Sequence, residues 1–356
     1  MTVPDRPTEV HRAPYDSSGA GMGLDRWTLR SDRIEATVIT LGAALHTLTA
    51  PDCAGTPAQV LLTTEDVGAL LGPAKHYGVT VGRYANRIAD SRVTLDGEDH
   101  PLLPTGHGVT LHGGPDSFSH RVWQAEEIPD GVRMHLHSPD GDQGFPGALD
   151  VWTDFTLNGA DLTISYRAVT TGPTVVNLTN HAYFNLAGEG RGDVLGHLLT
   201  IDADAITPVD ERQIPYGPFE PVAGTAFDFT SARPIREGLA QGHPQLKLSH
   251  GYDHNWVLRE RPADGPPVRA ALLADPGSGR TLEVLTTEPG LQVYTANGFD
   301  RSVVGPSGTR YGPFAGVALE TQHHPDSPHQ PSYPSTELRP GQEFRSSTVL
   351  RLGTAG

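Results

Sequence analysis

The 356-residue sequence is poor in cysteine, in positive charge and in long apolar runs. Its one cysteine, Cys53, excludes an intramolecular disulfide and fits a reducing compartment. Lys and Arg number 26 against 42 Asp and Glu, and the net charge of −16 argues against nucleic acid or an anionic membrane as a partner. No run approaches the length of a membrane span, and residues 1–24 contain no stretch apolar enough for a signal peptide. We therefore expect a cytoplasmic enzyme or binding protein.

Several signatures of known chemistry are absent as well. No nucleotide-binding glycine fingerprint follows a strand, and no Gly-x-Ser-x-Gly nucleophile motif occurs. The 17 histidines show no helical His-x₃-His spacing and no Cys–His spacing. The adjacent His323 and His324 would point to opposite faces of a strand. These patterns argue against a metal site.

Glycine and proline are abundant instead, with 41 and 31 residues, which favours many short elements joined by turns. Short runs typical of β-strands recur, and Asp96-Gly97 after one of them predicts a hairpin. Only residues 61–71 and 234–240 allow a helical turn or two. The sequence thus predicts an all-β fold, a sandwich or barrel, with one domain over residues 25–356 and a loose arm over residues 1–24. The strand-like runs are residues 34–40, 92–95, 132–137, 162–169, 198–201, 268–273, 281–286, 291–295, 317–320 and 347–352.

Residues 177–186, NLTNHAYFNL, sort by parity. If the segment is an extended strand, its even positions are mostly apolar and pack on a core. The odd positions then share one face, on which His181 and Tyr183 lie among amide and hydroxyl groups. An ordinary solvated face is the alternative, but such faces usually carry charged residues. A face of this composition favours recognition of a ligand ringed with hydroxyls, such as a sugar.

Glu320 ends the apolar run Gly316-Val-Ala-Leu-Glu and precedes a dense polar cluster. A carboxylate at the end of an apolar strand is partly desolvated, which raises its pKa toward that of a useful base. A surface glutamate at the point where the strand emerges is the alternative.

Two histidines are candidates for acid–base chemistry. His181 stands among hydrogen-bonding residues, and a histidine can hold or release a proton near neutral pH. His112 lies in Leu-His-Gly-Gly, where the glycines allow close backbone approach or a positive φ. The alternatives are a structural histidine and an incidental histidine in a turn.

Further polar candidates have weaker patterns. Asp253 stands at the start of a strand-like run, where a turn-capping aspartate is common. Gln292 and Tyr294 share one face of their predicted strand. Asn86 and Arg87 end an unusually polar phrase, for which a solvated loop is the alternative.

Six phrases together resemble the aldose 1-epimerase (galactose mutarotase) family. They are GRYANRI at 82–88, LHGG at 111–114, NLTNHAYFNLAG at 177–188, GYDHNWVL at 251–258, GLQVYTAN at 290–297 and LETQHHPDSPHQPSYPS at 319–335. The phrases follow the family's order and span most of the chain. The resemblance implies a single large antiparallel β-sandwich of the galactose mutarotase type, with a site in a cleft on one sheet. It implies no metal and no organic cofactor.

The resemblance also implies residue roles. Glu320 would be the catalytic base, His181 the catalytic acid, and His112 would assist beside the ring oxygen. Asn86, Arg87, Asp253 and Gln292 would hold sugar hydroxyls, and Tyr183 belongs to the same recognition face. The sequence departs from the family at Ala182, His324 and His329, where Ser, Phe and Asn are usual, and this leaves the preferred sugar open. We expect His323, His324 and His329 to be solvated surface residues.

The implied reaction is the exchange of α and β anomers of a free aldose such as galactose or glucose, by a monomer or homodimer. Glu320 as carboxylate would take the proton of the C1 hydroxyl, and His181 as imidazolium would protonate the ring oxygen. Because the two groups form a coupled pair, a bell-shaped pH dependence is expected.

Three other functions stay open on the sequence alone. A hexose 6-phosphate epimerase would need cations for the phosphate, and Arg83, Arg87 and Arg121 are available. A sugar-binding module without activity would not need the acid–base pair. A glycoside hydrolase usually works with two carboxylates rather than a glutamate and a histidine.

Overall fold

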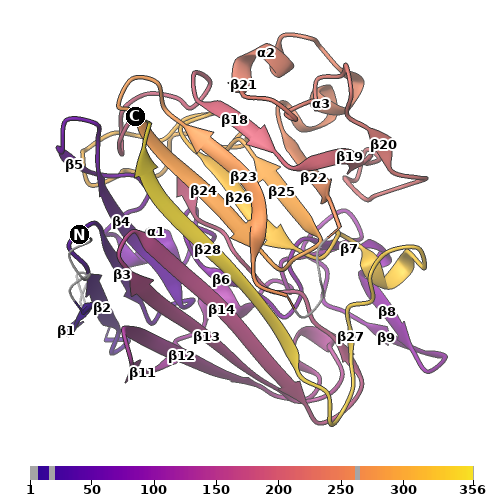
Figure 1. Cartoon of the computed structure of the whole chain (residues 1–356). Helices are drawn as coiled ribbons and strands as arrows, with labels where there is room; N and C mark the ends of the chain where they lie inside the picture. The colour runs from indigo at the N-terminus through magenta and orange to yellow at the C-terminus, as the bar shows by residue number, and fades with distance from the viewer. Residues whose placement is uncertain (1–6, 16–20, 261–264, 356) are drawn as a thin grey trace.

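The computed structural model describes residues 7–15, 21–260 and 265–355, and its regular structure is mainly antiparallel sheet (Figure 1). The predicted all-β sandwich is confirmed. The larger sheet has nine strands, in the order β11 (Gln124–Ile128), β12 (Gly131–Ser138), β13 (Leu149–Asn158), β14 (Asp161–Thr170), β28 (Phe344–Thr354), β24 (Arg280–Thr286), β23 (Val268–Ala274), β18 (Leu198–Ile201) and β21 (Arg233–Pro234). A second sheet has six, in the order β17 (Tyr183–Phe184), β26 (Val317–Gln322), β25 (Gly290–Tyr294), β22 (Asp253–Leu258), β19 (Ala203–Thr207) and β20 (Glu220–Pro221).

Strand alternation builds the core between these two sheets. Along β13 and β14 buried and half-buried side chains alternate, and Phe155 lies opposite Ile164 in the ladder. These residues share one hydrophobic core with Trp256 and Val293 of the six-stranded sheet. Strand β26 differs, because all of its residues are buried, so both of its faces are covered. Side chains on the second face of this sheet, opposite the main core, are therefore shielded from water.

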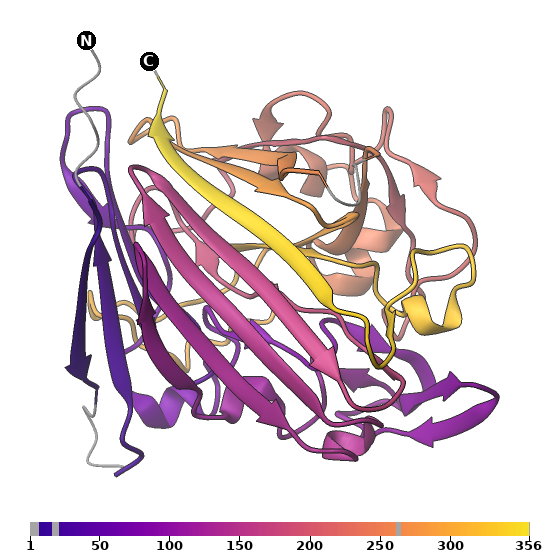
Figure 2. The same cartoon turned by 60° about the horizontal axis from the view of Figure 1, so that its bottom comes forward.

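A third sheet of five strands stands at one edge of the molecule, drawn in indigo in Figure 2 beside the long strands β12–β14 and β28. It contains β1 (Glu9–Pro14), β2 (Asp25–Arg30), β3 (Glu35–Ile39), β4 (Ala44–Pro51) and β5 (Pro57–Gln59). The predicted loose arm over residues 1–24 is therefore wrong for residues 9–14, which pair with β2 along their whole length. Val10 packs against the main core, but the strand has no buried residue, so its main-chain ladder holds it without a clear hydrophobic pattern. Residues 1–6 and 16–20 of the predicted arm lie outside the described residues.

The remaining elements are short. Two-stranded ladders join β6 (Thr80–Val81) to β16 (Thr179–Asn180), β7 (Arg87–Ile88) to β10 (Thr110–Leu111), β8 (Arg92–Leu95) to β9 (Glu98–Pro101), and β15 (Thr174–Val175) to β27 (Glu337–Leu338). The predicted hairpin is confirmed, since Asp96 and Gly97 both have positive φ between β8 and β9. The helices are α1 (Val67–Leu70), α2 (Ile235–Leu239) and α3 (Pro244–Ser249), and 3₁₀ turns cover Ala89–Ser91, Phe118–His120, Asp142–Gly144 and Ser327–His329. Within the described ranges no helix combines the length and hydropathy needed to cross a bilayer.

All ten predicted strand-like runs coincide with strands, and both regions of expected helical turns contain a short helix. The ten-residue strand β13 was not predicted. Its sequence, LDVWTDFTLN, alternates in burial, but Trp152 on the outward face interrupts the polar half of the pattern. Helix α3 was also not predicted, and it carries Ser249 at its end.

Arg83 is a structural cation inside the fold. Its side chain is 2% exposed, and burial lowers its pKa to about 10, so it remains charged at neutral pH. The guanidinium donates to the carbonyl oxygens of Ser138, Pro139, Phe145, Pro146 and Gly147 and to the hydroxyl of Ser138. Arg83 thus ties the segment before β7 to the turn between β12 and β13, and it is not available to a ligand.

Replacing Arg83 by Met should destabilise the fold severely, because several buried carbonyl oxygens would lose their donors. We expect the free energy of unfolding to fall by roughly 3 kcal/mol or more, measured by urea denaturation. Arg345→Met is the matched control, since the exposed Arg345 pairs only with Glu343 at the surface. Equal stability of the Arg83→Met and Arg345→Met variants would contradict the structural role.

Candidate active site

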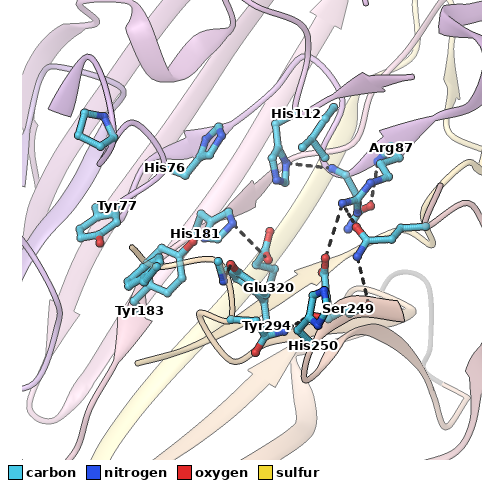
Figure 3. A pocket seen from close by; sticks show the side chains of 18 residues that line it. His76, Tyr77, Arg87, His112, His181, Tyr183, Ser249, His250, Tyr294 and Glu320 are labelled. Carbon is cyan, nitrogen blue, oxygen red and sulfur yellow. Dashed lines mark hydrogen bonds and ion pairs between the residues drawn. The ribbon is translucent and has the colours of Figure 1, made fainter. Parts of the chain in front are cut away.

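A cavity of about 440 Å³ opens beside the six-stranded sheet (Figure 3). Seven of the eight residues predicted for the site line it, and they come from segments far apart in the chain. They are Asn86, Arg87, His112, His181, Tyr183, Asp253 and Glu320. The eighth, Gln292, does not line the cavity but donates from its side-chain amide to the Asp253 carboxylate at 2.6 Å. The fold therefore gathers the predicted residues at one place.

Strand register places the residues on the sheet. Tyr183, Ala318, Tyr294 and Asp253 form one row across β17, β26, β25 and β22, because each is the ladder partner of the next. Glu320 lies two positions along β26 from Ala318 and therefore faces the same way. This face of the sheet is the floor of the cavity, and Glu320 lies in it.

We predicted one continuous strand for the segment that carries His181, but the structure has two short strands there. Strand β16 pairs with β6, whereas β17 pairs with β26. His181 lies between them, and its backbone is held on both sides, donating to the carbonyl of Val79 and accepting from the N–H of Gly78. The apolar even positions do enter the main core, as predicted: Leu178, Ala182, Phe184 and Leu186. The break leaves the His181 ring in the cavity with both sides of its backbone fixed.

His112 and Asn86 hold each other in place. The backbone N–H of Asn86 donates to His112 Nδ1 at 3.1 Å, and the N–H of His112 donates to the carbonyl of Asn86 at 3.0 Å. Because Nδ1 accepts a hydrogen bond, the proton of the neutral ring lies on Nε2. Burial lowers the pKa of His112 well below its ordinary value, so the ring is neutral. His112 is thus held as a hydrogen-bond donor toward the cavity.

Close backbone contact explains the glycines of the Leu-His-Gly-Gly phrase. Gly113 has a φ of +85°, and a Cβ there would lie 2.1 Å from the carbonyl oxygen of Gly82. Only glycine satisfies both constraints, so the predicted close approach is confirmed. The contact sets the position of His112 relative to the segment that carries Asn86 and Arg87.

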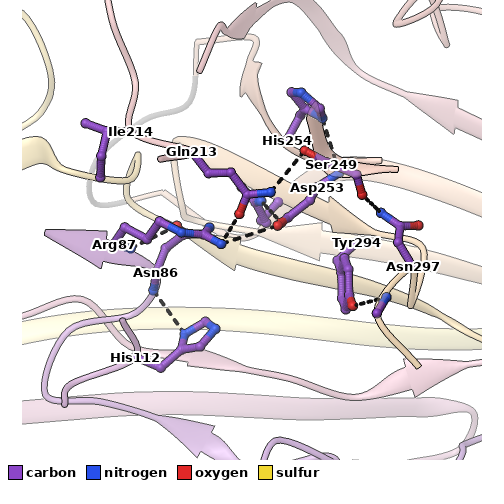
Figure 4. Close-up of polar contacts among 12 residues, drawn as sticks. Asn86, Arg87, His112, Gln213, Ile214, Ser249, Asp253, His254, Tyr294 and Asn297 are labelled. Carbon is purple, nitrogen blue, oxygen red and sulfur yellow. Dashed lines mark hydrogen bonds and ion pairs between the residues drawn. The ribbon is translucent and has the colours of Figure 1, made fainter. Parts of the chain in front are cut away.

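Arg87 and Asp253 form a charged pair at the edge of the cavity (Figure 4). Arg87 Nη2 lies 3.6 Å from Asp253 Oδ2, and the guanidinium also donates to the side-chain oxygen of Gln213. Gln292 fixes the other carboxylate oxygen of Asp253. Both charged side chains keep some exposure, 15% and 17%, so they can exchange part of these contacts for ligand hydroxyls.

Glu320 and His181 form the buried pair at the centre of the site. Glu320 Oε1 lies 3.5 Å from His181 Nε2, and the two residues are 1% and 4% exposed. Burial lowers the pKa of His181 to about 4. Burial and the Asp253 carboxylate raise the pKa of Glu320 well above its usual range, and Arg87 opposes this shift only in part.

These pKa shifts favour protonation states that differ from those predicted from the sequence. The sequence prediction placed a carboxylate at Glu320 and an imidazolium at His181. Loss of water disfavours both charged forms, so the empty cavity favours a protonated Glu320 beside a neutral His181. In either protonation state the Glu320–His181 pair carries one transferable proton, and the two groups that can hold it are in near contact.

The geometry around His112 opposes metal binding. One potential ligand atom each from His112, His181 and Glu320 lies within 4.8 Å of the others. Coordination by His112 Nε2 would require its proton to move to Nδ1, where it would meet the N–H of Asn86. The three residues therefore do not fit a metal ion.

Several lining residues were not predicted. His76 stacks near His181 and His112, and Gln213, Ser249, His250 and Phe299 complete the walls. Tyr294 was noted only for sharing a face with Gln292. These residues, apart from Tyr294 on β25 and Ser249 at the end of α3, lie in loops or short turns, where no periodic pattern marks them.

Of the three histidines expected at the surface, one is buried and two are half-buried. His324 is 2% exposed, and its ring nitrogen contacts the Asn255 amide at 3.0 Å. His323 pairs with the buried Glu288 at 2.7 Å, and His329 pairs with the buried Asp326 at 2.6 Å, while their side chains keep 19% and 26% exposure. Surface solvation is therefore wrong for His324 and holds only in part for the other two, because buried carboxylates and amides supply partners that a local sequence window does not show.

The protonation of the pair can be tested directly. In the ligand-free protein at neutral pH, we expect the His181 ring to be neutral, since burial disfavours the imidazolium. Nitrogen chemical shifts of labelled histidine report this state. Glu320→Gln mimics the protonated carboxyl and should leave the shifts of His181 nearly unchanged. An imidazolium at His181 that disappears in Glu320→Gln would instead show a buried ion pair.

Comparison with known proteins agrees with the site. The family model described as aldose 1-epimerase matches residues 25–351. The chain is 41% identical to galactose mutarotase of Rattus norvegicus over 95% of this chain and 96% of that protein. It is also 41% identical to aldose 1-epimerase of Escherichia coli (strain K12) over 91% and 94%.

Solved structures give the same result for the fold. The crystal structure of galactose 1-epimerase from Lactobacillus acidophilus superposes with a TM-score of 0.84 at 26% identity, covering 98% of this chain and 100% of that one. The GalM/aldose epimerase homologue from C. elegans superposes with a TM-score of 0.82 at 28% identity, over 91% and 97%. The sequence matches, the fold and the gathered site residues together establish that this chain belongs to the aldose 1-epimerase family.

Proposed function

We propose that the protein interconverts the α and β anomers of free aldohexoses such as galactose and glucose, with Glu320 and His181 as its acid–base pair. The observation that carries the proposal is this buried pair, 3.5 Å apart, in the floor of a cavity whose walls present hydrogen-bonding groups. Membership of the aldose 1-epimerase family supports the same reaction.

The reaction needs one proton removed and one supplied. A cyclic aldose opens when its C1 hydroxyl loses a proton while its ring oxygen gains one, and the open aldehyde recloses on the other face after rotation about C1–C2. A pair that holds one proton performs both transfers: one member accepts while the other donates. In the roles that the family resemblance implies, Glu320 faces the C1 hydroxyl and His181 faces the ring oxygen.

The burial of the pair explains how its proton is distributed. Ring opening by a Glu320 carboxylate and a His181 imidazolium ends with Glu320 protonated and His181 neutral. This end state is also the state that burial favours in the empty cavity. Sugar hydroxyls that hydrogen-bond to the carboxylate stabilise its charged form and return the proton to His181. Binding of the sugar thus lowers the free-energy difference between the two states of the pair.

The other lining residues position the sugar. His112 donates from Nε2 beside His181, which suits the ring oxygen or a neighbouring hydroxyl. Arg87 and Asp253 offer a donor and an acceptor for vicinal hydroxyls, and Asn86 holds His112. Tyr183 and Tyr294 supply aromatic surface against which the sugar's C–H groups pack.

The arginines give little support to the alternative of a hexose 6-phosphate epimerase. Arg83 is enclosed by backbone carbonyls, and Arg121 pairs with Asp116 and Asp142 outside the catalytic cavity. Arg87 remains, but Asp253 already balances its charge. Within the catalytic cavity the arginines thus favour a neutral sugar over a hexose 6-phosphate, whereas Lys75 and Arg212 line the cavity that adjoins it.

Removing either member of the pair should abolish most of the activity. We expect Glu320→Gln and His181→Ala each to slow the approach of freshly dissolved α-D-galactose and α-D-glucose to anomeric equilibrium by roughly 10²–10⁴-fold, followed by polarimetry. Glu288→Gln is the matched control, because Glu288 is a buried glutamate that pairs with a histidine, His323, outside the catalytic cavity. Comparable losses in all three variants would point to a general effect on folding. Wild type no faster than buffer would refute the proposed activity.

The activity should stay constant over a wide range of pH. The pair takes up a second proton only as the pH falls toward the lowered pKa of His181, about 4, and loses its last proton only above the raised pKa of Glu320. We therefore expect kcat/KM for galactose to stay flat through pH 6.5 and to fall on the acid side near pH 4. A single titration centred near pH 6.5, the ordinary histidine value, would contradict this assignment.

A further inference from the structure

His76 is a third histidine in the site, and none of the phrases that resemble the family contains it. Its ring stacks on His181 with 5.7 Å between centroids and 16° between planes, and it lies 4.9 Å from the His112 ring. Figure 3 shows it beside both rings. The ring is therefore part of the cavity wall rather than of the solvated loop surface.

One ring nitrogen of His76 has no partner among the described residues. Nδ1 is buried without a hydrogen bond. Burial lowers the pKa of His76 well below its ordinary value, so the ring is a neutral donor and acceptor. A buried, unpaired polar atom is costly, which suggests that a bound ligand supplies the missing hydrogen bond.

His76 also marks the junction of two cavities. A second cavity of about 420 Å³ adjoins the first, and the two share His76, Arg87, Leu111 and Gln213. Space is therefore available beside His76 for a substituent that extends beyond the sugar ring.

The geometry of a pyranose links His76 to one substituent. This step rests on the proposed function, in which Glu320 faces the C1 hydroxyl and His181 and His112 face the ring oxygen. C1 and C5 flank the ring oxygen, so C5 lies on the side of the two histidines away from Glu320. His76 stands on that side: Figure 3 shows it beyond the His181 and His112 rings from Glu320, and its ring stacks on His181, which in turn lies 3.5 Å from Glu320.

We propose that His76 is a specificity-determining residue, which hydrogen-bonds the hydroxyl on the exocyclic carbon attached to C5 and thereby favours aldohexoses over sugars that lack this hydroxyl. The contact satisfies a His76 nitrogen that has no partner in the empty site. It also places the exocyclic group at the opening to the second cavity. The residue positions the substrate and takes no part in proton transfer.

The test compares sugars that differ only at this carbon. D-Galactose carries the hydroxyl, D-fucose (6-deoxy-D-galactose) has a methyl group instead, and L-arabinose lacks the carbon. We would measure kcat and KM by polarimetry for wild type, His76→Phe and His76→Gln. His76→Phe keeps a planar ring but removes both nitrogens, and His76→Gln restores a hydrogen-bonding amide. His135→Phe is the control, because His135 is a half-buried histidine on β12, paired with Asp150 outside the cavity.

We expect wild type to prefer D-galactose over D-fucose by about tenfold in kcat/KM, the effect of one hydrogen bond. His76→Phe should lose this preference through a higher KM for D-galactose, with D-fucose and L-arabinose nearly unaffected, and His76→Gln should restore part of it. Equal losses for all three sugars in His76→Phe, or no preference in wild type, would overturn the proposed contact. Wild type inactive on every sugar would instead overturn the proposed function on which the contact rests.

Discussion

The burial of both faces of the six-stranded sheet is the constraint on which the site depends. One face packs against the nine-stranded sheet, and loops cover the other, so β26 has no exposed residue. Glu320 on that second face loses most of its water, which raises its pKa, and the His181 ring, 3.5 Å away, is buried as well, which lowers its own pKa. Beside the pair, the mutual hydrogen bonds of His112 and Asn86 hold a donor in a fixed position.

The arginines show how the fold separates structural from binding charge. Arg83 and Arg87 belong to the same polar phrase and are only four residues apart. Arg83 enters the interior, where backbone carbonyls surround it, whereas Arg87 reaches the cavity and meets Asp253. The first holds the loop, and the second offers a donor that a hydroxyl can share. The excess of acidic residues in the composition therefore says little about the site, where one cation and one anion balance.

Much of the fold and of the site could be predicted from the sequence, because both rest on local patterns. Alternation correctly assigned Leu178 and Phe184 to the core, but it could not show the break after Asn180, since the two halves pair with strands distant in the chain. His76 carried no signal, because its position depends on stacking against His181 rather than on periodicity. The charge state of Glu320 and His181 also escaped prediction, since complete desolvation comes from loops that close over the sheet.

The contact between Gly113 and Gly82 has a consequence for how such a protein can change over evolutionary time. A side chain at Gly113 would strike the backbone at Gly82, and one at Gly82 would strike the Phe118 ring. The two phrases are separated by about thirty residues in the chain, yet the backbone of the first limits the side chain that the second can carry. A constraint of this kind keeps the frame of the site fixed, whereas adaptation can act on side chains that line the cavity, such as His76.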